Sequence, residues 1–175
     1  MGYLKFIKLK KKVSINIINI KINIFKKNNI NLFRDLELYA RLTKDKKIIG
    51  ITGTNGKSSV VDFFYQILNH NKVSVASIGT LGIFSKNYNK KTNLTSMDPL
   101  SLHKNLEILA KNKIKNVILE ASSHGLEQKR LDNLNINTGI FTNLSHDHLD
   151  YHKNMNLYLN SKMHLFKNLL KKNSK

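Results

Sequence analysis

The segment from residue 50 to residue 59, GITGTNGKSS, constrains the fold of this chain more than any other part of it. The segment 46–51 before it, rich in isoleucine, is typical of a short buried strand, and the segment 60–68 after it predicts a helix. A glycine-rich turn between a strand and a helix exposes consecutive backbone N–H groups, to which the helix N-terminus adds partial positive charge. The segment therefore predicts a phosphate-binding loop and a nucleoside triphosphate, ATP, as its ligand.

Two side chains of this loop suit the predicted chemistry. Lys57 has the length to reach the outer phosphates, and the Ser58 hydroxyl is a suitable Mg²⁺ ligand. The spacing Gly-x-x-Gly-Lys-Ser is shorter than the general P-loop pattern, which requires glycine where this chain has Ile51. The alternative is an ordinary glycine-rich turn, and the flanking strand and helix favour the phosphate-binding interpretation.

Length and composition narrow the class of protein. A chain of 175 residues has room for one domain, or for one domain with an appendage. It contains no cysteine, so disulfides and thiol chemistry are excluded and a reducing compartment is expected. Neither a membrane-spanning apolar run nor a convincing signal peptide is present in the sequence. We therefore expect a cytoplasmic protein without a membrane partner.

The formal net charge of +19 raises the alternative of a basic nucleic-acid-binding module. Lysine, however, is spread along the whole chain together with asparagine and isoleucine, while arginine, the usual residue of base and phosphate readout, is nearly absent. Such a whole-chain bias is typical of an AT-rich coding sequence. We therefore expect no nucleic-acid partner.

Hydrophobic periodicity predicts further elements along the chain. The Lys-, Ile- and Asn-rich segment 1–34 contains a strand-like alternation at 18–24. Additional strands are predicted at 73–77, 116–120 and 136–141, and helices at 32–42, 100–112 and 154–170, with a polar loop at 86–95. Strands that alternate with helices predict a three-layer α/β domain with a mostly parallel sheet. In such sheets ligands bind at the carboxyl ends of the strands.

Several polar residues follow predicted strands. Glu120 ends one strand and is either a Mg²⁺ ligand or a solvated strand-end acid. Segment 143–152 contains three histidines and two aspartates within seven residues, which suggests a metal site, zinc included, or a proton-transfer site, with an incidental polar loop as the alternative. Lys162 falls on the apolar side of the last helix, where a lysine either snorkels to solvent or is buried for a special purpose.

Four motifs in order carry a family resemblance: GITGTNGKSS at 50–59, LTS at 94–96, EASSHGLEQKR at 120–130 and FTNLSHDHLDYH at 141–152. Together they resemble the Mur ligases, the ATP-dependent amide-forming enzymes of peptidoglycan synthesis, and in particular the members that add the third amino acid of the stem peptide. The resemblance covers about residues 40–170. A folate-type polyglutamate ligase would share the loop but is not expected to carry the Ser-Ser-His-Gly-Leu run.

The resemblance implies roles for the matching residues. The nucleotide phosphates would be bound by Gly53, Thr54, Asn55, Gly56, Lys57, Ser58 and Ser59. The UDP-sugar-peptide substrate would be bound by Thr95, Ser96, Ser122, Gln128 and Arg130. The catalytic residues would be Lys57, Glu120, His148 and Lys162. Mg²⁺ would be held by Ser58, Glu120, His148 and Lys162, the last after carbamylation.

The resemblance also implies the reaction. The D-glutamate carboxylate of UDP-N-acetylmuramoyl-L-alanyl-D-glutamate would take the γ-phosphate of ATP, and a diamino acid would then displace phosphate from the acyl phosphate. Meso-diaminopimelate is the commoner diamino acid in the family and lysine is the alternative. Burial of Lys162 would lower its pKa and assist its reaction with CO₂ to a carbamate that organises a second Mg²⁺.

Mur ligases have three domains, which sets an expectation for the domain organisation. Residues 1–45 would be a shortened remnant of the uridine-binding domain, residues 46–175 part of the central ATP-binding domain, and the C-terminal domain absent. We expect such a chain not to complete ligation alone, and a separate chain to supply the missing domains if the enzyme is split. A decayed fragment without activity is the alternative.

Overall fold

The computed structural model describes residues 47–92 and 94–170. The chain divides into two units, Met1–Asp35 and Leu36–Lys175, and all described residues belong to the second. Three predictions lie outside the described residues: the strand pattern at 18–24, the helix at 32–42 and the domain boundary after residue 45.

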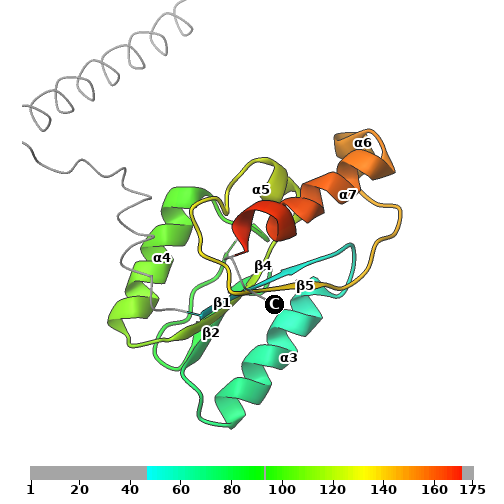
Figure 1. Ribbon diagram of the computed structural model, residues 1–175. Coiled ribbons are helices and arrows are strands. Elements are labelled where there is room, and N and C mark those ends of the chain that lie inside the picture. Colours follow the sequence, from blue (N-terminus) through cyan, green and yellow to red (C-terminus); the bar gives the residue numbers. More distant parts are fainter. Residues whose placement is uncertain (1–46, 93, 171–175) are drawn as a thin grey trace, which may run out of the picture. The chain divides into compact units, whose positions relative to one another are not determined.

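A five-stranded sheet forms the centre of the described domain (Figure 1). Its order is β3-β2-β4-β1-β5, and its strands are β1 (Lys47–Thr52), β2 (Val75–Gly79), β3 (Gly82–Ser85), β4 (Asn116–Glu120) and β5 (Thr138–Phe141). β2, β4, β1 and β5 run parallel to their neighbours, and β3 alone pairs antiparallel, with β2. The predicted mostly parallel sheet is confirmed.

The antiparallel strand β3 was not predicted. It follows β2 after only two residues, and Gly82 begins it with φ 127°, a conformation that favours glycine. Within the segment predicted as a polar loop, Lys90 forms an isolated antiparallel bridge with Ile83 of β3. The four residues of β3 were too few to give a periodic signal.

Helices cover both faces of the sheet. α3 (Lys57–His70) lies on one face, where its Val61 joins a core cluster with Ile51, Val75 and Ile118. α4 (Pro99–Lys111) and α5 (Ser123–Glu127) lie on the other face, together with the C-terminal helices (Figure 1). The larger core cluster on that face includes the α4 residues Leu102, Leu106 and Leu109. The domain therefore has the three layers that the sequence predicts.

The C-terminal helix differs from its prediction. Instead of one α-helix over 154–170, the chain forms the short α6 (Leu149–His152), then α7 (Met155–His164), and then a π-helical turn, η1 (Leu165–Leu169). η1 buries both Leu165 and Leu169 against the sheet. It approaches closely because the facing strand positions are glycines: a methyl group at Gly50 would lie 3.0 Å from the Cδ1 atom of Leu165. This packing fixes α7, and with it Lys162, over the end of β1.

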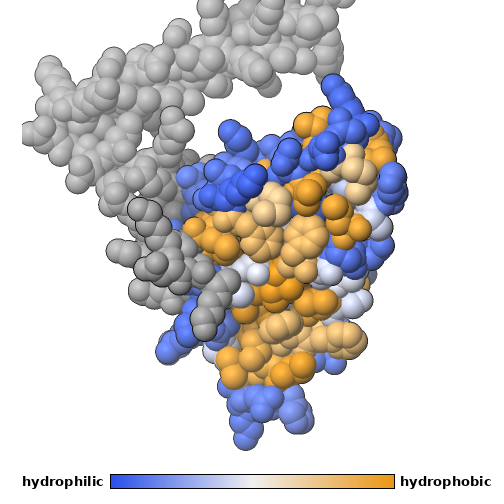
Figure 2. Space-filling view, turned by 45° about the vertical axis from the view of Figure 1, so that its right-hand side comes forward, coloured by the Kyte–Doolittle hydropathy of each residue, from blue (hydrophilic) through white to orange (hydrophobic). Residues whose placement is uncertain are grey.

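One edge of the sheet is β5, which pairs only with β1 among the described residues. β5 is only partly buried, and on the neighbouring α3 the side chains of Phe63 and Ile67 are 61% and 60% exposed. Figure 2 shows a broad gathering of apolar residues on one face of the domain. No helix in the described part of the chain is long and apolar enough to cross a membrane.

Candidate functional site

The predicted phosphate-binding loop connects the end of β1 to the start of α3. Gly53 and Gly56 adopt φ values of 144° and 80°, which only glycine adopts easily. The segment after β5 supports the loop: the backbone N–H groups of Thr54 and Asn55 donate to the carbonyl and side-chain oxygens of Asn143, both at 2.9 Å. The Thr142 hydroxyl also donates to the Asn55 carbonyl at 2.7 Å. Thr142 and Asn143 thus support the loop, and neither received an individual role in the sequence analysis.

Two lysines converge on this loop. Lys57 Nζ donates to the carbonyl oxygens of Gly53 and Thr54 at 3.0 and 2.8 Å, and Lys162 Nζ donates to the same Gly53 oxygen at 2.7 Å. Lys162 is only 1% exposed, so the snorkelling alternative is wrong. Burial, and then the charge of Lys57, lower the pKa of Lys162 to about 7. Burial also lowers the pKa of Lys57. The loop therefore brings two lysine amines together, and both can donate hydrogen bonds to phosphate oxygens.

A buried carboxylate lies beside the loop. Glu120 is 2% exposed, and its Oε2 accepts a hydrogen bond from Ser58 Oγ at 3.1 Å. Hydroxyl and carboxylate oxygens are the ligands that Mg²⁺ prefers, so these two residues fit the predicted metal site. The alternative of a solvated strand-end acid is wrong, because the carboxylate is buried.

The histidine-rich segment forms a packed cluster. The ring of His124 lies 4.1 Å from that of Tyr151 and 4.9 Å from that of His148, and the buried His152 Nε2 lies 3.0 Å from Ser123 Oγ. Burial is the main cause that lowers the pKa values of His124 and His152. Among the described residues no three His, Cys, Asp or Glu side chains are placed to hold a metal, so the zinc alternative has no support.

The predicted substrate residues meet on the other side of Glu120. Ser96 Oγ donates to the Glu120 carbonyl at 3.2 Å and lies 3.1 Å from Ser122 Oγ. Arg130 donates to the Ser96 carbonyl at 2.8 Å and to Gln128 Oε1 at 2.6 and 2.9 Å. Hydrogen bonds thus connect four of the five predicted substrate residues directly.

One open pocket of about 300 Å³ joins these groups at the carboxyl ends of the strands. It is lined by Lys57, Leu94, Thr95, Ser96, Ser122, Ser123, His124, Gln128, Arg130, His148 and Lys162. The lining contains all five predicted substrate residues and three of the four predicted catalytic residues; the fourth, the buried Glu120, lines a separate small cavity together with Ser58.

Tyr158 is a further site residue that sequence reasoning missed. Its hydroxyl donates to Thr54 Oγ1 at 3.2 Å, and Lys162 Nζ lies 4.2 Å from the centre of its ring. Its position four residues before Lys162, on the same face of a helix, was the available signal.

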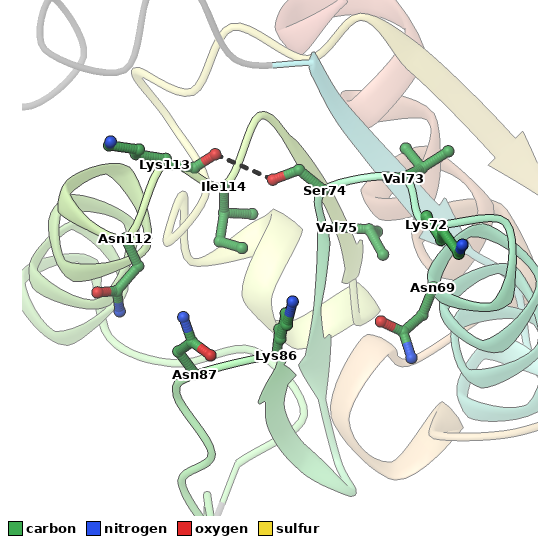
Figure 3. A pocket seen from close by; sticks show the side chains of 10 residues that line it. All are labelled: Asn69, Lys72, Val73, Ser74, Val75, Lys86, Asn87, Asn112, Lys113 and Ile114. Carbon is green, nitrogen blue, oxygen red and sulfur yellow. Dashed lines mark hydrogen bonds between the residues drawn. The ribbon is translucent and has the colours of Figure 1, made fainter.

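A larger cavity, of about 690 Å³, lies at the opposite ends of the strands (Figure 3). Ser74 and Lys113 meet there through a 2.9 Å hydrogen bond, just before β2 and β4 begin. α3 and α4 both end at this cavity, so their partial negative charge faces it. Ligands of parallel α/β sheets bind at the carboxyl ends, and we therefore place the candidate site in the smaller pocket.

The profile of the Mur ligase middle domain matches residues 51–175. This chain belongs to the Mur ligase family. Two similar proteins are named UDP-N-acetylmuramoyl-L-alanyl-D-glutamate–2,6-diaminopimelate ligase. The one from Brucella melitensis biotype 1 is 45% identical over 125 residues, which cover 71% of this chain and 26% of the relative. The one from Rickettsia bellii is 47% identical over 133 residues, covering 74% and 28%.

One solved structure agrees with this assignment, and a second shares the fold. A structure of UDP-N-acetylmuramoyl-L-alanyl-D-glutamate–2,6-diaminopimelate ligase aligns with TM-score 0.64 and 38% identity over 72% of this chain and 26% of that one. E. coli FolC in complex with DHPP and ADP shares the fold, with TM-score 0.56 and 16% identity, over 78% of this chain and 40% of that one. The chain spans about a quarter of the length of the curated relatives described above.

Proposed function

We propose that this chain carries the ATP- and UDP-sugar-peptide-binding core of a ligase that adds diaminopimelate to UDP-N-acetylmuramoyl-L-alanyl-D-glutamate. One observation carries the proposal: the loop lysine, a second buried lysine and all five expected substrate residues line one pocket. The names of the relatives support diaminopimelate rather than lysine as the added amino acid.

The residues of the pocket suit phosphoryl transfer followed by amide formation. Lys57 and the loop N–H groups would hold the phosphates of ATP, and Lys57 would exchange its bonds to the loop carbonyls for phosphate oxygens. Ser58, Glu120 and His148 would hold Mg²⁺, which when bound neutralises phosphate charge.

The substrate residues would align the D-glutamate carboxylate for in-line attack on the γ-phosphorus. This attack gives an acyl phosphate and ADP, and the incoming amine then displaces phosphate from the acyl carbon. Positioning and charge stabilisation supply the catalysis.

We include the carbamylation of Lys162 in the proposal. A neutral amine attacks CO₂ and loses one proton, which gives a carbamate anion. Because the pKa of Lys162 is about 7, a large fraction of this side chain is neutral at physiological pH. Its position beside the Gly53 carbonyl would place the carbamate next to the phosphates as a further Mg²⁺ ligand.

The proposal extends to the domain organisation. Residues 1–45 would be a remnant of the uridine-binding domain, and the parts of the relatives beyond the matched quarter would be supplied by further sequence, in this chain or a separate one. Ligation by the 175-residue chain alone is then not expected. We place the ligase in the cytoplasm.

Substrate binding tests this proposal. Isothermal titration of UDP-N-acetylmuramoyl-L-alanyl-D-glutamate should give saturable binding that weakens about tenfold or more in Arg130→Ala, since the pocket then loses a half-buried guanidinium that can bind a charged substrate group and that also holds the Ser96 carbonyl. Lys104→Ala removes an exposed positive charge from α4 and should bind as the wild type does. A different result would favour the basic binding module: no substrate binding, together with nucleic-acid binding that falls steeply with salt concentration and is unchanged in Lys57→Ala.

A further inference from the structure

The Glu120 carboxylate is held by a turn that neither the family motifs nor the proposed reaction uses. The turn is Gly79-Thr80, at the end of β2. The backbone N–H of Thr80 donates to Glu120 Oε1 at 2.8 Å, and the Thr80 hydroxyl lies 3.2 Å from Glu120 Oε2. One residue therefore holds both oxygens of the carboxylate, which fixes its plane.

Gly79 provides the space for this arrangement. A Cβ atom at position 79 would overlap the Oε1, Cδ and Cγ atoms of Glu120. Any larger residue there would push the carboxylate out of its place beside Ser58, so glycine is required for a close approach rather than for an unusual φ.

The same threonine also contacts the substrate pocket. Thr80 Oγ1 lies 3.0 Å from Oγ1 of Thr95, which lines the pocket. A hydroxyl has a single proton and a carboxylate can only accept, so the consistent order is Thr95 O–H to Thr80 and Thr80 O–H to Glu120. This order leaves the lone pairs of Thr95 available to accept hydrogen bonds from a substrate.

We propose that Gly79 and Thr80 form a positioning element that orients Glu120 for Mg²⁺ and links it to Thr95 at the substrate pocket. The inference rests on the proposed function, because it takes the site of Ser58 and Glu120 as the Mg²⁺ site. Thr80 is a positioning residue: it acts through Glu120 and Thr95 rather than on the reacting atoms.

The test is the Mg²⁺ dependence of ADP binding, measured by isothermal titration at a series of Mg²⁺ concentrations. Thr80→Val keeps the backbone N–H but removes the hydroxyl, and should raise the Mg²⁺ concentration at half-effect about three- to tenfold, as expected for one hydrogen bond to a charged group. Thr80→Ser should stay within about twofold of the wild type. ADP affinity without metal should not change in either variant.

Ser74→Ala is the matched control, since it removes an exposed hydroxyl directly before the first residue of β2, at the end of the strand away from Glu120. Gly79→Ala, checked for folding by circular dichroism, should raise the Mg²⁺ concentration at half-effect more than Thr80→Val does. Three results would overturn the inference. The Mg²⁺ concentration at half-effect could stay unchanged in Thr80→Val, or it could rise as much in Thr80→Ser as in Thr80→Val. The third is a lower affinity of either variant for ADP in the absence of metal. A wild type that binds ADP with no Mg²⁺ dependence would overturn the proposed metal site itself.

Discussion

Burial of Lys162 makes a measurable prediction about stability and pH. The pKa of this lysine falls from 10.5 to about 7 on folding, so between these values the unfolded chain binds more protons than the folded one. Stability contributed by this group therefore rises as the pH rises from about 7 towards 10.5, and is lowest below pH 7. Lys162→Met keeps the apolar length of the side chain and removes the titration.

The magnitude follows from linkage. One pKa unit corresponds to roughly 1.4 kcal/mol. At pH 6 the lowered pKa of Lys162 costs the folded state about 5 kcal/mol, mainly because a charged lysine is buried. At pH 9 it costs about 2 kcal/mol, because the lysine must lose its proton on folding. The free energy of unfolding of the wild type, measured against that of Lys162→Met, should therefore rise by about 3 kcal/mol between pH 6 and pH 9.

Urea unfolding, followed by circular dichroism in CO₂-free buffers, measures this difference. Lys167→Met, in the next helical turn, removes an exposed lysine and should reproduce the pH profile of the wild type. Parallel profiles of the wild type and Lys162→Met would refute the reasoning, because they would mean that Lys162 keeps its ordinary pKa in the folded chain.

Three further predictions concern single positions. The carboxylate of Asp98 caps α4 by accepting from Ser101 N at 2.9 Å, so Asp98→Ala should lower the free energy of unfolding by about 1 kcal/mol in urea titrations. Since that hydrogen bond lowers the pKa of Asp98, the loss should shrink as the pH falls below about 4. Lys113, two residues after the end of α4, has φ 60°, and Lys113→Gly should raise the thermal midpoint, gaining roughly 0.5–1 kcal/mol; a lower midpoint would contradict this. With ¹³CO₂ at constant pressure, a carbamate signal in ¹³C NMR should grow from pH 6 to pH 8 and be missing from Lys162→Ala.

Much of the fold and of the site could be predicted because local patterns decide them. The strand–loop–helix at the phosphate-binding loop follows from the glycines and from the apolar runs on either side. Glu120 ends β4 and Ser122 follows it directly, and the carboxyl ends of parallel strands meet at one edge of a sheet. Predicted residues far apart in the sequence therefore line one pocket.

What the sequence did not predict depends on contacts through space. Thr80 holds Glu120 only because a tight turn returns β3 alongside β2, and four residues give no strand period. The π-helical turn η1 forms where glycine positions on the sheet allow a close approach. Tyr158 belongs to the site because its hydroxyl bonds to Thr54, more than a hundred residues earlier in the chain. Contacts between residues far apart in the chain produce no periodic pattern that could be detected in a single sequence.

The central claim is that this pocket binds Mg-ATP through the loop. The most direct test is isothermal titration of Mg-ATP into the folded chain and into two variants. Lys57→Ala removes the loop lysine, and Lys104→Ala is the control, because it removes one positive charge from α4. We expect saturable binding by the wild type and by Lys104→Ala. The affinity of Lys57→Ala for Mg-ATP should be lower by about tenfold or more. Equal binding by all three proteins, or no binding by a folded wild type, would contradict the assignment of the site.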